Sequence, residues 1–245
     1  MIATTYKARL QKKELVAENT MAFYLEKPVD FFFKPGQYLD VSLIDPAETD
    51  EDGNIRSFSI ASGPADKYLV VVTRMRDTAF KRVMEATPLN TEIALEGPFG
   101  YFTLHYNPMK PAVFLAAGLG ITPFLSMLRH AVVQKRFQQL YLFYENRHPE
   151  DAAFLSELLE MKALNPNFRF IPTMTGVEHS KQPWSEETGT VDGHMLSKHL
   201  TRLRGPIYYV AGPPAMVAQK RKMLVAAGID FDDVTTEEFV GYLDV

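Results

Sequence analysis

The sequence predicts a two-domain protein of the α+β class, with an N-terminal antiparallel β-barrel in residues 1–107 and an α/β parallel-sheet domain in residues 108–245. Three observations support this. Short alternating or β-rich runs separated by turns fill the first half. Strand and helix patterns alternate in the second half, and this alternation is typical of a parallel sheet. The length of 245 residues is also enough for two ordinary domains, and the rhythm changes near residues 105–111.

The first domain is expected to contain five strands and one helix. The strands are predicted at residues 20–26, 37–44, 56–62, 68–74 and 91–97, and the helix at residues 78–86. Turn signals such as Lys34-Pro35-Gly36 and Gly63-Pro64 separate the strands. The acidic, turn-rich segment 45–54 is expected to be an exposed loop.

The second domain is expected to alternate strands with helices. The strands are predicted at residues 111–118, 139–146, 168–175 and 206–212, and the helices at residues 122–134, 151–164, 192–201 and 214–228. This order favours a parallel sheet with helices on both faces.

Composition excludes several classes of function. The net charge of -4 and the pI near 5.9 give no electrostatic basis for a nucleic-acid partner. No apolar run approaches the roughly 20 residues that span a bilayer. The absence of cysteine excludes disulfides, thiolate zinc sites and cysteine-ligated iron–sulfur clusters within this sequence, and His194 and His199 lack the spacing of a helical metal site. We expect a cytoplasmic monomer without a metal.

Two glycine turns suggest a ligand site. Gly118-Leu119-Gly120 lies between a buried strand and a helix, with Pro123 in the first helical turn, and Gly212-Pro213-Pro214 repeats this layout. Helix N-termini suit phosphates, and ligands of doubly wound sheets bind at the carboxyl ends of the strands. One such turn alone could be only a tight connection. Two turns on the same edge favour a shared dinucleotide site.

The strand at residues 56–62 has an unusual composition. If regular, it places Arg56, Phe58 and Ile60 on one face, and Ser57 and Ser59 on the other. One interpretation is an edge strand with a solvated arginine. The alternative is a strand that lines a cofactor, with the arginine on phosphate and the phenylalanine against a flat ring.

Four motifs in order resemble the ferredoxin–NADP reductase superfamily, and they extend over nearly the whole chain. They are Arg56-Ser57-Phe58-Ser59-Ile60-Ala61-Ser62, Gly97-Pro98-Phe99-Gly100, Gly118-Leu119-Gly120-Ile121-Thr122-Pro123 and Gly212-Pro213-Pro214-Ala215-Met216. The resemblance implies FAD in the barrel and a nicotinamide dinucleotide, NADH or NADPH, on the α/β domain. It also implies a C-terminal segment that returns to the flavin.

The resemblance also implies roles for single residues. Arg56 would bind the flavin pyrophosphate, Phe58 would pack on the isoalloxazine or ribityl, and Ser59 would hydrogen-bond near flavin N5. The other implied cofactor-binding residues are Ser57, Val72, Thr73, Thr78, Gly118, Gly120, Thr122, Pro123, Arg147, Gly212, Pro213 and Met216. The implied catalytic residues are Ser59, Glu238 and Phe239. Phe239 would cover the flavin and yield to nicotinamide, unless it only fills the core of the α/β domain.

The function implied is a flavin-dependent oxidoreductase. Electrons would pass from NAD(P)H through FAD to a separate acceptor such as a ferredoxin, a flavodoxin or an oxygenase component. Two departures from the family pattern point to the alternative of a non-catalytic or regulatory subunit, whereas the intact residues 56–59 and both glycine turns argue against it. Ala211 stands where many members have cysteine, and residues 77–81 lack the usual G-x-x-S of the flavin pyrophosphate helix.

The choice of dinucleotide depends on cations, because a 2′-phosphate needs them. Arg147 occupies one expected arginine position, whereas residues 175–176 and 189–190 lack arginine. Glu145, at a strand end, suits a ribose diol. Lys181 could still bind a phosphate. The sequence therefore favours NADH.

Overall fold

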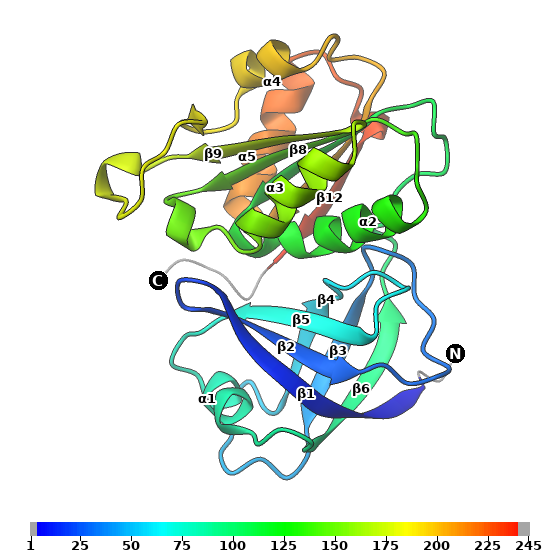
Figure 1. Cartoon of the computed structure of the whole chain (residues 1–245), viewed down its shortest axis with the longest axis vertical. Coiled ribbons are helices and arrows are strands. Elements are labelled where there is room, and N and C mark those ends of the chain that lie inside the picture. Colours follow the sequence, from blue (N-terminus) through cyan, green and yellow to red (C-terminus); the bar gives the residue numbers. More distant parts are fainter. Residues whose placement is uncertain (1–3, 240–245) are drawn as a thin grey trace.

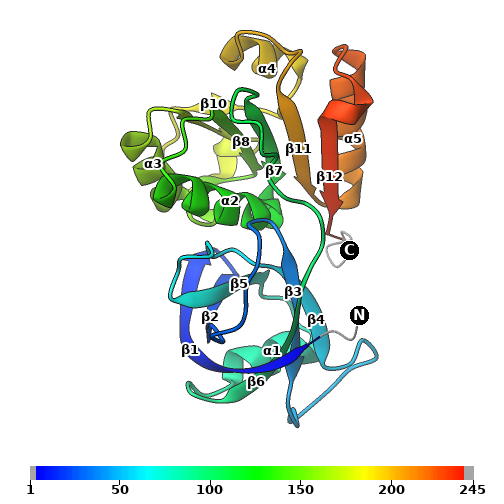
Figure 2. The same cartoon turned by 90° about the vertical axis from the view of Figure 1, so that its right-hand side faces the viewer.

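The computed structural model describes residues 4–239, which form two separate sheets, one above the other in Figure 1. Each sheet has six strands. The segment from the end of the first sheet at Phe99 to the start of the second at Ala112 joins them, and Figure 2 shows it running between the two layers. The predicted boundary between residues 107 and 108 falls within this connection.

The first sheet is antiparallel and curled. Its strands are β1 (Thr5–Ala17), β2 (Thr20–Glu26), β3 (Tyr38–Leu43), β4 (Ile55–Ser59), β5 (Tyr68–Arg74) and β6 (Glu92–Phe99), in the spatial order β4-β3-β6-β1-β2-β5. Helix α1 (Ala79–Ala86) lies between β5 and β6 in the chain. The two edge strands, β4 and β5, do not pair with each other to close the sheet. One backbone hydrogen bond connects the two edges, because the Ala61 amide, just past β4, donates to the Val70 backbone oxygen at 2.8 Å. The predicted barrel is therefore a half-barrel.

The second sheet is parallel, with helices on both faces, as predicted. Its strands are β7 (Ala112–Ala117), β8 (Leu140–Asn146), β9 (Phe168–Met174), β10 (Glu187–Thr188), β11 (Ile207–Gly212) and β12 (Val234–Glu238). Its helices are α2 (Ile121–Val133), α3 (Leu155–Leu164), α4 (Gly193–His199) and α5 (Pro214–Ala226). Buried residues of α2 and α3 belong to one apolar cluster, and those of α4 and α5 belong to another.

The strand order β10-β9-β8-β7-β11-β12 places β7 beside β11 at the point where the connections reverse direction. The carboxyl ends of these two strands carry the two glycine turns. This is the edge at which open α/β sheets bind their ligands. The order of the strands therefore brings together two turns that lie about ninety residues apart in the chain.

Several elements differ from the prediction. Strands β1 and β12 were not predicted, because β1 is rich in charge and β12 reads Val-Thr-Thr-Glu-Glu without an apolar alternation. The helix predicted from residue 122 begins at Ile121, after a 3₁₀ turn at Gly118–Gly120. The helix predicted from residue 151 begins only at Leu155, because Phe154 adopts a left-handed conformation before it.

Candidate functional site: two adjoining cavities

A cavity of about 660 Å³ lies where the curled sheet meets β12 and the start of α2. The predicted cofactor residues that line it are Arg56, Ser57, Phe58, Ser59, Val72 and Thr122. The predicted catalytic residues Glu238 and Phe239 line it as well. The cavity is thus formed by side chains from segments that are distant in the sequence. We call it the barrel cavity.

The guanidinium of Arg56 is held by the acidic loop 45–54. Its Nη2 lies 3.2 Å from Asp50 Oδ1, and its Nη1 donates to the backbone oxygens of Asp52 and Ile55 at 2.8 Å each. The guanidinium also lies 5.2 Å from the centre of the Phe80 ring. Arg56 is therefore not a freely solvated edge residue. It lines the cavity and is also bound to the acidic loop.

Other candidates on β4 differ in how firmly they are held. Phe58 is half-buried, with its ring 6.0 Å from that of Phe80. The hydroxyl of Ser57 donates to Asp40, whereas no side-chain hydrogen bond is found for Ser59 among residues 4–239. The hydroxyl of Ser59, on the cavity wall, therefore remains available to a ligand.

Thr73 and Thr78 are two of the predicted residues that line neither cavity. Thr73 is buried, and it lies on β5 next to Val72, which does line the barrel cavity. Thr78 precedes α1, and its side chain makes no capping hydrogen bond to that helix. The α1 N-terminus instead donates to Asp50, because the Ala79 amide lies 3.0 Å from Asp50 Oδ2.

The sequence-based prediction missed Glu237. Its Oε2 is buried, faces the barrel cavity and has no hydrogen-bond partner within the described chain, and burial raises the pKa of this carboxyl to about 7. Glu238 is exposed. The missed signal is the period of two in a strand, which places Glu237 and Phe239 on the same face, whereas Glu238 points to the other.

A second cavity, of about 200 Å³, lies at the carboxyl edge of the parallel sheet. We call it the sheet-edge cavity. The predicted residues Gly118, Gly120, Arg147 and Pro213 line it, and Thr175 also contributes. Arg74 and Arg76, from the end of β5, reach it from the other domain. The cavity therefore combines a glycine turn with cationic side chains, an arrangement that suits a phosphate.

The two glycines of the first turn have different roles. Gly118 has φ of +50° and no atom within 4 Å of a Cβ position, so it borders open space. A Cβ on Gly120 would lie 2.0 Å from the backbone oxygen of Ala211. Gly120 thus allows the turn to pack directly on β11, and Gly118 leaves room for a ligand.

Three further predicted residues support this corner by packing. Thr122 and Pro123 are buried in the first turn of α2, and the Thr122 hydroxyl donates to the Leu119 backbone oxygen at 2.9 Å. A Cβ on Gly212 would lie 2.5 Å from Met216 Cε, so Met216 packs closely under the second turn. Neither Thr122 nor Met216 lines the sheet-edge cavity.

Glu145 enters the sheet-edge cavity from the end of β8 and is fixed there. Its Oε2 accepts a hydrogen bond of 2.8 Å from Lys220, which is 2% exposed, and one of 2.9 Å from the Val191 amide. Arg147 is 71% exposed and lies 3.7 Å from Asp151. Lys181 lies outside this cavity and pairs with Glu18.

Phe239 and Leu119 line both cavities, so the two cavities adjoin. Phe239 is half-buried and packs against the apolar cluster beneath α2 and α3. Its amide donates to the Gly212 backbone oxygen at 2.9 Å, which anchors the end of β12 beside the second glycine turn. Phe239 therefore forms part of the wall between the cavities.

A cationic cluster lies beside both cavities. Burial, together with the nearby charges of Arg76, Arg56 and Arg74, lowers the pKa of Lys81 to about 8. These four cations come from β4, from β5 and the residues after it, and from α1. An accumulation of positive charge of this kind attracts phosphate groups.

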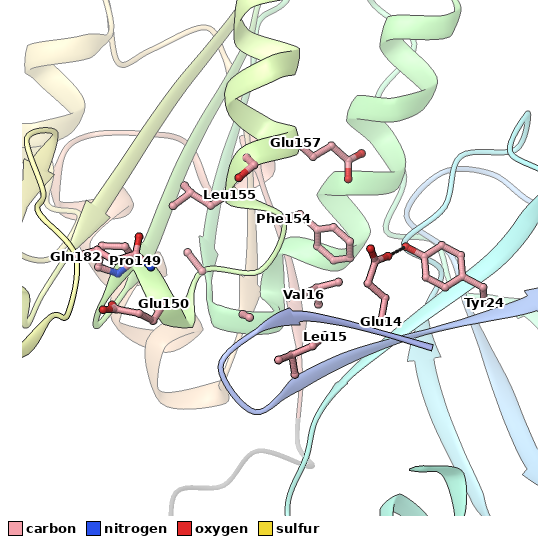
Figure 3. A pocket seen from close by; sticks show the side chains of 13 residues that line it. Glu14, Leu15, Val16, Tyr24, Pro149, Glu150, Phe154, Leu155, Glu157 and Gln182 are labelled. Atoms are coloured by element: carbon pink, nitrogen blue, oxygen red, sulfur yellow. Dashed lines mark hydrogen bonds between the residues drawn. The ribbon is translucent and has the colours of Figure 1, made fainter. Parts of the chain in front are cut away.

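A third cavity, of about 550 Å³, lies between the β1–β2 hairpin and the segment leading into α3 (Figure 3). Its carboxylates already have partners. Glu14 accepts from the Tyr24 hydroxyl, Glu157 accepts from Arg129 at 2.7 Å, and Glu150 accepts from the Lys181 amide. The third cavity is therefore part of the seam between the domains.

Other kinds of site have no counterpart within residues 4–239. No group of three or more His, Cys, Asp or Glu side chains there could hold a metal ion. In the same part of the chain, no helix has the length and apolarity needed to cross a bilayer.

Known proteins resemble this chain in sequence and in fold. Residues 114–222 match the oxidoreductase NAD-binding domain family. The reductase component of propane 2-monooxygenase from Mycolicibacterium smegmatis is 31% identical over 218 residues, which are 87% of this chain and 61% of that protein. The glycine betaine monooxygenase reductase subunit from Chromohalobacter salexigens is 27% identical, over 90% of this chain and 60% of that protein.

Solved structures share the fold. A ferredoxin NADP⁺ reductase from Neisseria gonorrhoeae with bound FAD and NADP superposes with a TM-score of 0.78 at 20% identity, covering 96% of this chain and 98% of that one. The chain therefore has the fold of this ferredoxin NADP⁺ reductase. A cytochrome P450 reductase from Amycolatopsis gives a TM-score of 0.80 at 21% identity, covering 98% of this chain and 71% of that one. The chain spans only about 60% of the length of the two curated relatives described above.

Proposed function

We propose that this protein is a member of the ferredoxin–NADP reductase superfamily and an FAD-dependent NAD(P)H oxidoreductase that passes electrons to a separate acceptor. Residues 1–107 would hold the flavin, and residues 108–245 would hold the dinucleotide. The observation that carries the proposal is the adjacency of the two cavities across Phe239. Hydride transfer needs mainly distance and alignment between two rings, and adjoining cavities would let a flavin and a nicotinamide lie close together.

The barrel cavity fits FAD in size and in chemistry. It offers about 660 Å³, within the range of cofactor pockets, with a half-buried aromatic ring at Phe58 and the Arg56 cation at one end. FAD would supply the ability to take up a hydride and to release the electrons to an acceptor. Ser59 would hydrogen-bond the flavin, and Glu237 Oε2, which has no partner in the described chain, would hold a proton beside it.

NADH is the proposed donor. The Glu145 carboxylate is fixed at the sheet-edge cavity by buried Lys220, and its Oε1 remains available to accept from ribose hydroxyls. The same fixed negative charge would repel a 2′-phosphate. Arg147 is the one arginine present at the three positions considered in the sequence, and Asp151 lies beside it.

The proposed acceptor is an oxygenase component. The two curated relatives described above are reductase components or subunits of monooxygenases. A ferredoxin and a flavodoxin remain alternatives of the same kind. We further propose that the protein works as a monomer in the cytoplasm. A chain without cysteine forms no disulfides, so it gains no stability from an oxidising compartment.

The test is spectroscopic. The purified protein should be yellow, and its flavin absorbance should bleach on anaerobic addition of NADH, faster than with NADPH. A colourless protein that binds no added FAD would overturn the proposed function. A yellow protein that neither dinucleotide bleaches would favour the alternative of a non-catalytic subunit, which the substitution of cysteine by Ala211 also suggests.

A further inference from the structure

We propose that Asp50 is a built-in competitor for the flavin phosphates, so that the acidic loop 45–54 controls how tightly the cofactor is held. This inference rests on the proposed function and adds regulation of the flavin site. It concerns a loop that no sequence motif connects with the cofactor.

Asp50 occupies both anion-binding groups of the flavin site. One carboxylate oxygen lies 3.2 Å from the Arg56 guanidinium, and the other accepts the Ala79 amide at 3.0 Å, at the N-terminus of α1. Arg56 and this helix N-terminus are the two groups that the sequence assigned to the flavin pyrophosphate. A phosphate that used both of them would have to displace the Asp50 carboxylate.

The surroundings favour an anion at this position, whichever group supplies it. The charges of Arg56, Arg74 and Arg76 all act on Lys81, and their sum attracts a carboxylate or a phosphate. A carboxylate and a phosphate both form charge-assisted hydrogen bonds with such donors, so either anion can occupy this position. The internal carboxylate is always present, and its presence lowers the apparent affinity for the external phosphate.

The loop is suited to exchange its partners. Asp50 is one of five acidic residues between positions 45 and 52, and Arg56 also donates to the backbone oxygens of Asp52 and Gly53. The side chain of Asp50 is 32% exposed, so it can move into solvent without crossing the core. Binding of a flavin phosphate would therefore release the loop from Arg56.

The test compares flavins that differ in phosphate content. FAD, FMN and riboflavin are titrated into the full-length chain after removal of its flavin, and binding is followed by quenching of flavin fluorescence. Asp50→Asn removes the charge but keeps an oxygen that can accept from Ala79. Glu51→Gln is the matched control, because it removes the same charge from an exposed neighbour in the same loop.

The expected result is about tenfold tighter binding of FAD and FMN by Asp50→Asn, with riboflavin binding and the control unchanged. Equal or weaker FAD and FMN binding by Asp50→Asn would overturn the inference, and would leave Asp50 as a cap that orders α1. An equal gain for riboflavin, or in Glu51→Gln, would also overturn it. If the unaltered chain binds none of the three flavins, the proposed function fails together with the inference.

Discussion

The two cavities are built on different principles. The sheet-edge cavity is defined by backbone, because Gly120 lets the first turn pack directly against Ala211 and Gly118 leaves open space beside it. The barrel cavity is defined by side chains that β3, β4, β5 and β12 bring together. Substitutions at the sheet-edge corner should therefore affect folding first. Substitutions in the barrel cavity should affect binding and protonation first.

The largest expected effect is at Gly120. Gly120→Ala places a methyl group against the backbone of β11, which cannot move aside, so the free energy of unfolding should fall by about 3 kcal/mol or more. Urea unfolding measures this. Gly118→Ala is the control, because its methyl group meets no atom and only the left-handed backbone is strained, at a cost of about 1 kcal/mol. Equal losses in both variants would contradict the distinction between the two glycines.

The next largest effect is a pH dependence at Glu237. Since burial raises the pKa of its carboxyl to about 7, the native state binds a proton that the unfolded chain would release from about pH 4.5 upward. The stability due to this proton is complete below pH 4.5 and is lost as the pH rises to about 7. Glu237→Gln has no such loss, so it should be more stable than the unaltered protein by about 3 kcal/mol at pH 8.

Thermal unfolding between pH 5 and pH 8.5 checks the Glu237 prediction. The difference between Glu237→Gln and the unaltered protein should grow with pH and level off above pH 7. Glu238→Gln removes the same charge from the exposed neighbour, and its effect should stay within about 0.5 kcal/mol. A larger pH-dependent effect at Glu238 would show that Glu238, and not Glu237, is the carboxyl with the raised pKa.

Arg56 should affect binding of the flavin more than folding. Arg56→Ala removes a charge-assisted contact of about 1.5–3 kcal/mol, so FAD should dissociate at least about tenfold more easily. Equilibrium titration with FAD measures this. Arg82→Ala is the control, since Arg82 is an arginine on α1 that pairs with Glu48 and lines neither cavity. An unchanged FAD affinity in Arg56→Ala would show that Arg56 only orders its loop.

The smallest effect is expected at Phe239, the shared wall. Aromatic stacking on a flavin contributes about 0.5–1.5 kcal/mol, so Phe239→Ala should tighten dinucleotide binding severalfold and alter the flavin spectrum. Because Phe239 is only half-buried, its truncation should cost less than the about 3–5 kcal/mol of a core phenylalanine. Phe231→Ala, at an exposed ring, controls for loss of apolar surface. If Phe239→Ala instead lost as much stability as a core phenylalanine and kept its dinucleotide affinity, Phe239 would not be a ring that covers the flavin and yields to nicotinamide.

The sequence was most informative where the backbone itself makes the site. The turn at Gly118–Gly120 and the turn after β11 were predicted as one dinucleotide edge, and the strand order brings them together. Prediction was weaker at β12, whose polar residues gave no periodic signal. The choice of Glu238 as the acid beside Phe239 followed from the resemblance of the terminal segment; both Glu237 and Glu238 line the barrel cavity, and only Glu237 has a buried carboxylate oxygen without a partner in the described chain.

The sequence by itself determined the two-domain order, the α/β half with its glycine turns, and Arg56 and Phe58 as cofactor candidates. Each of these depends on local patterns of residue type, which a linear chain displays. Only the tertiary structure decided that Asp50 lies on Arg56 and on the start of α1, that Lys220 fixes Glu145, and that Phe239 separates the two cavities. Most of those contacts join residues far apart in the chain, such as Asp50 with Ala79 and Lys220 with Glu145. Their distances depend on how the sheets curl and pack, which no local pattern specifies.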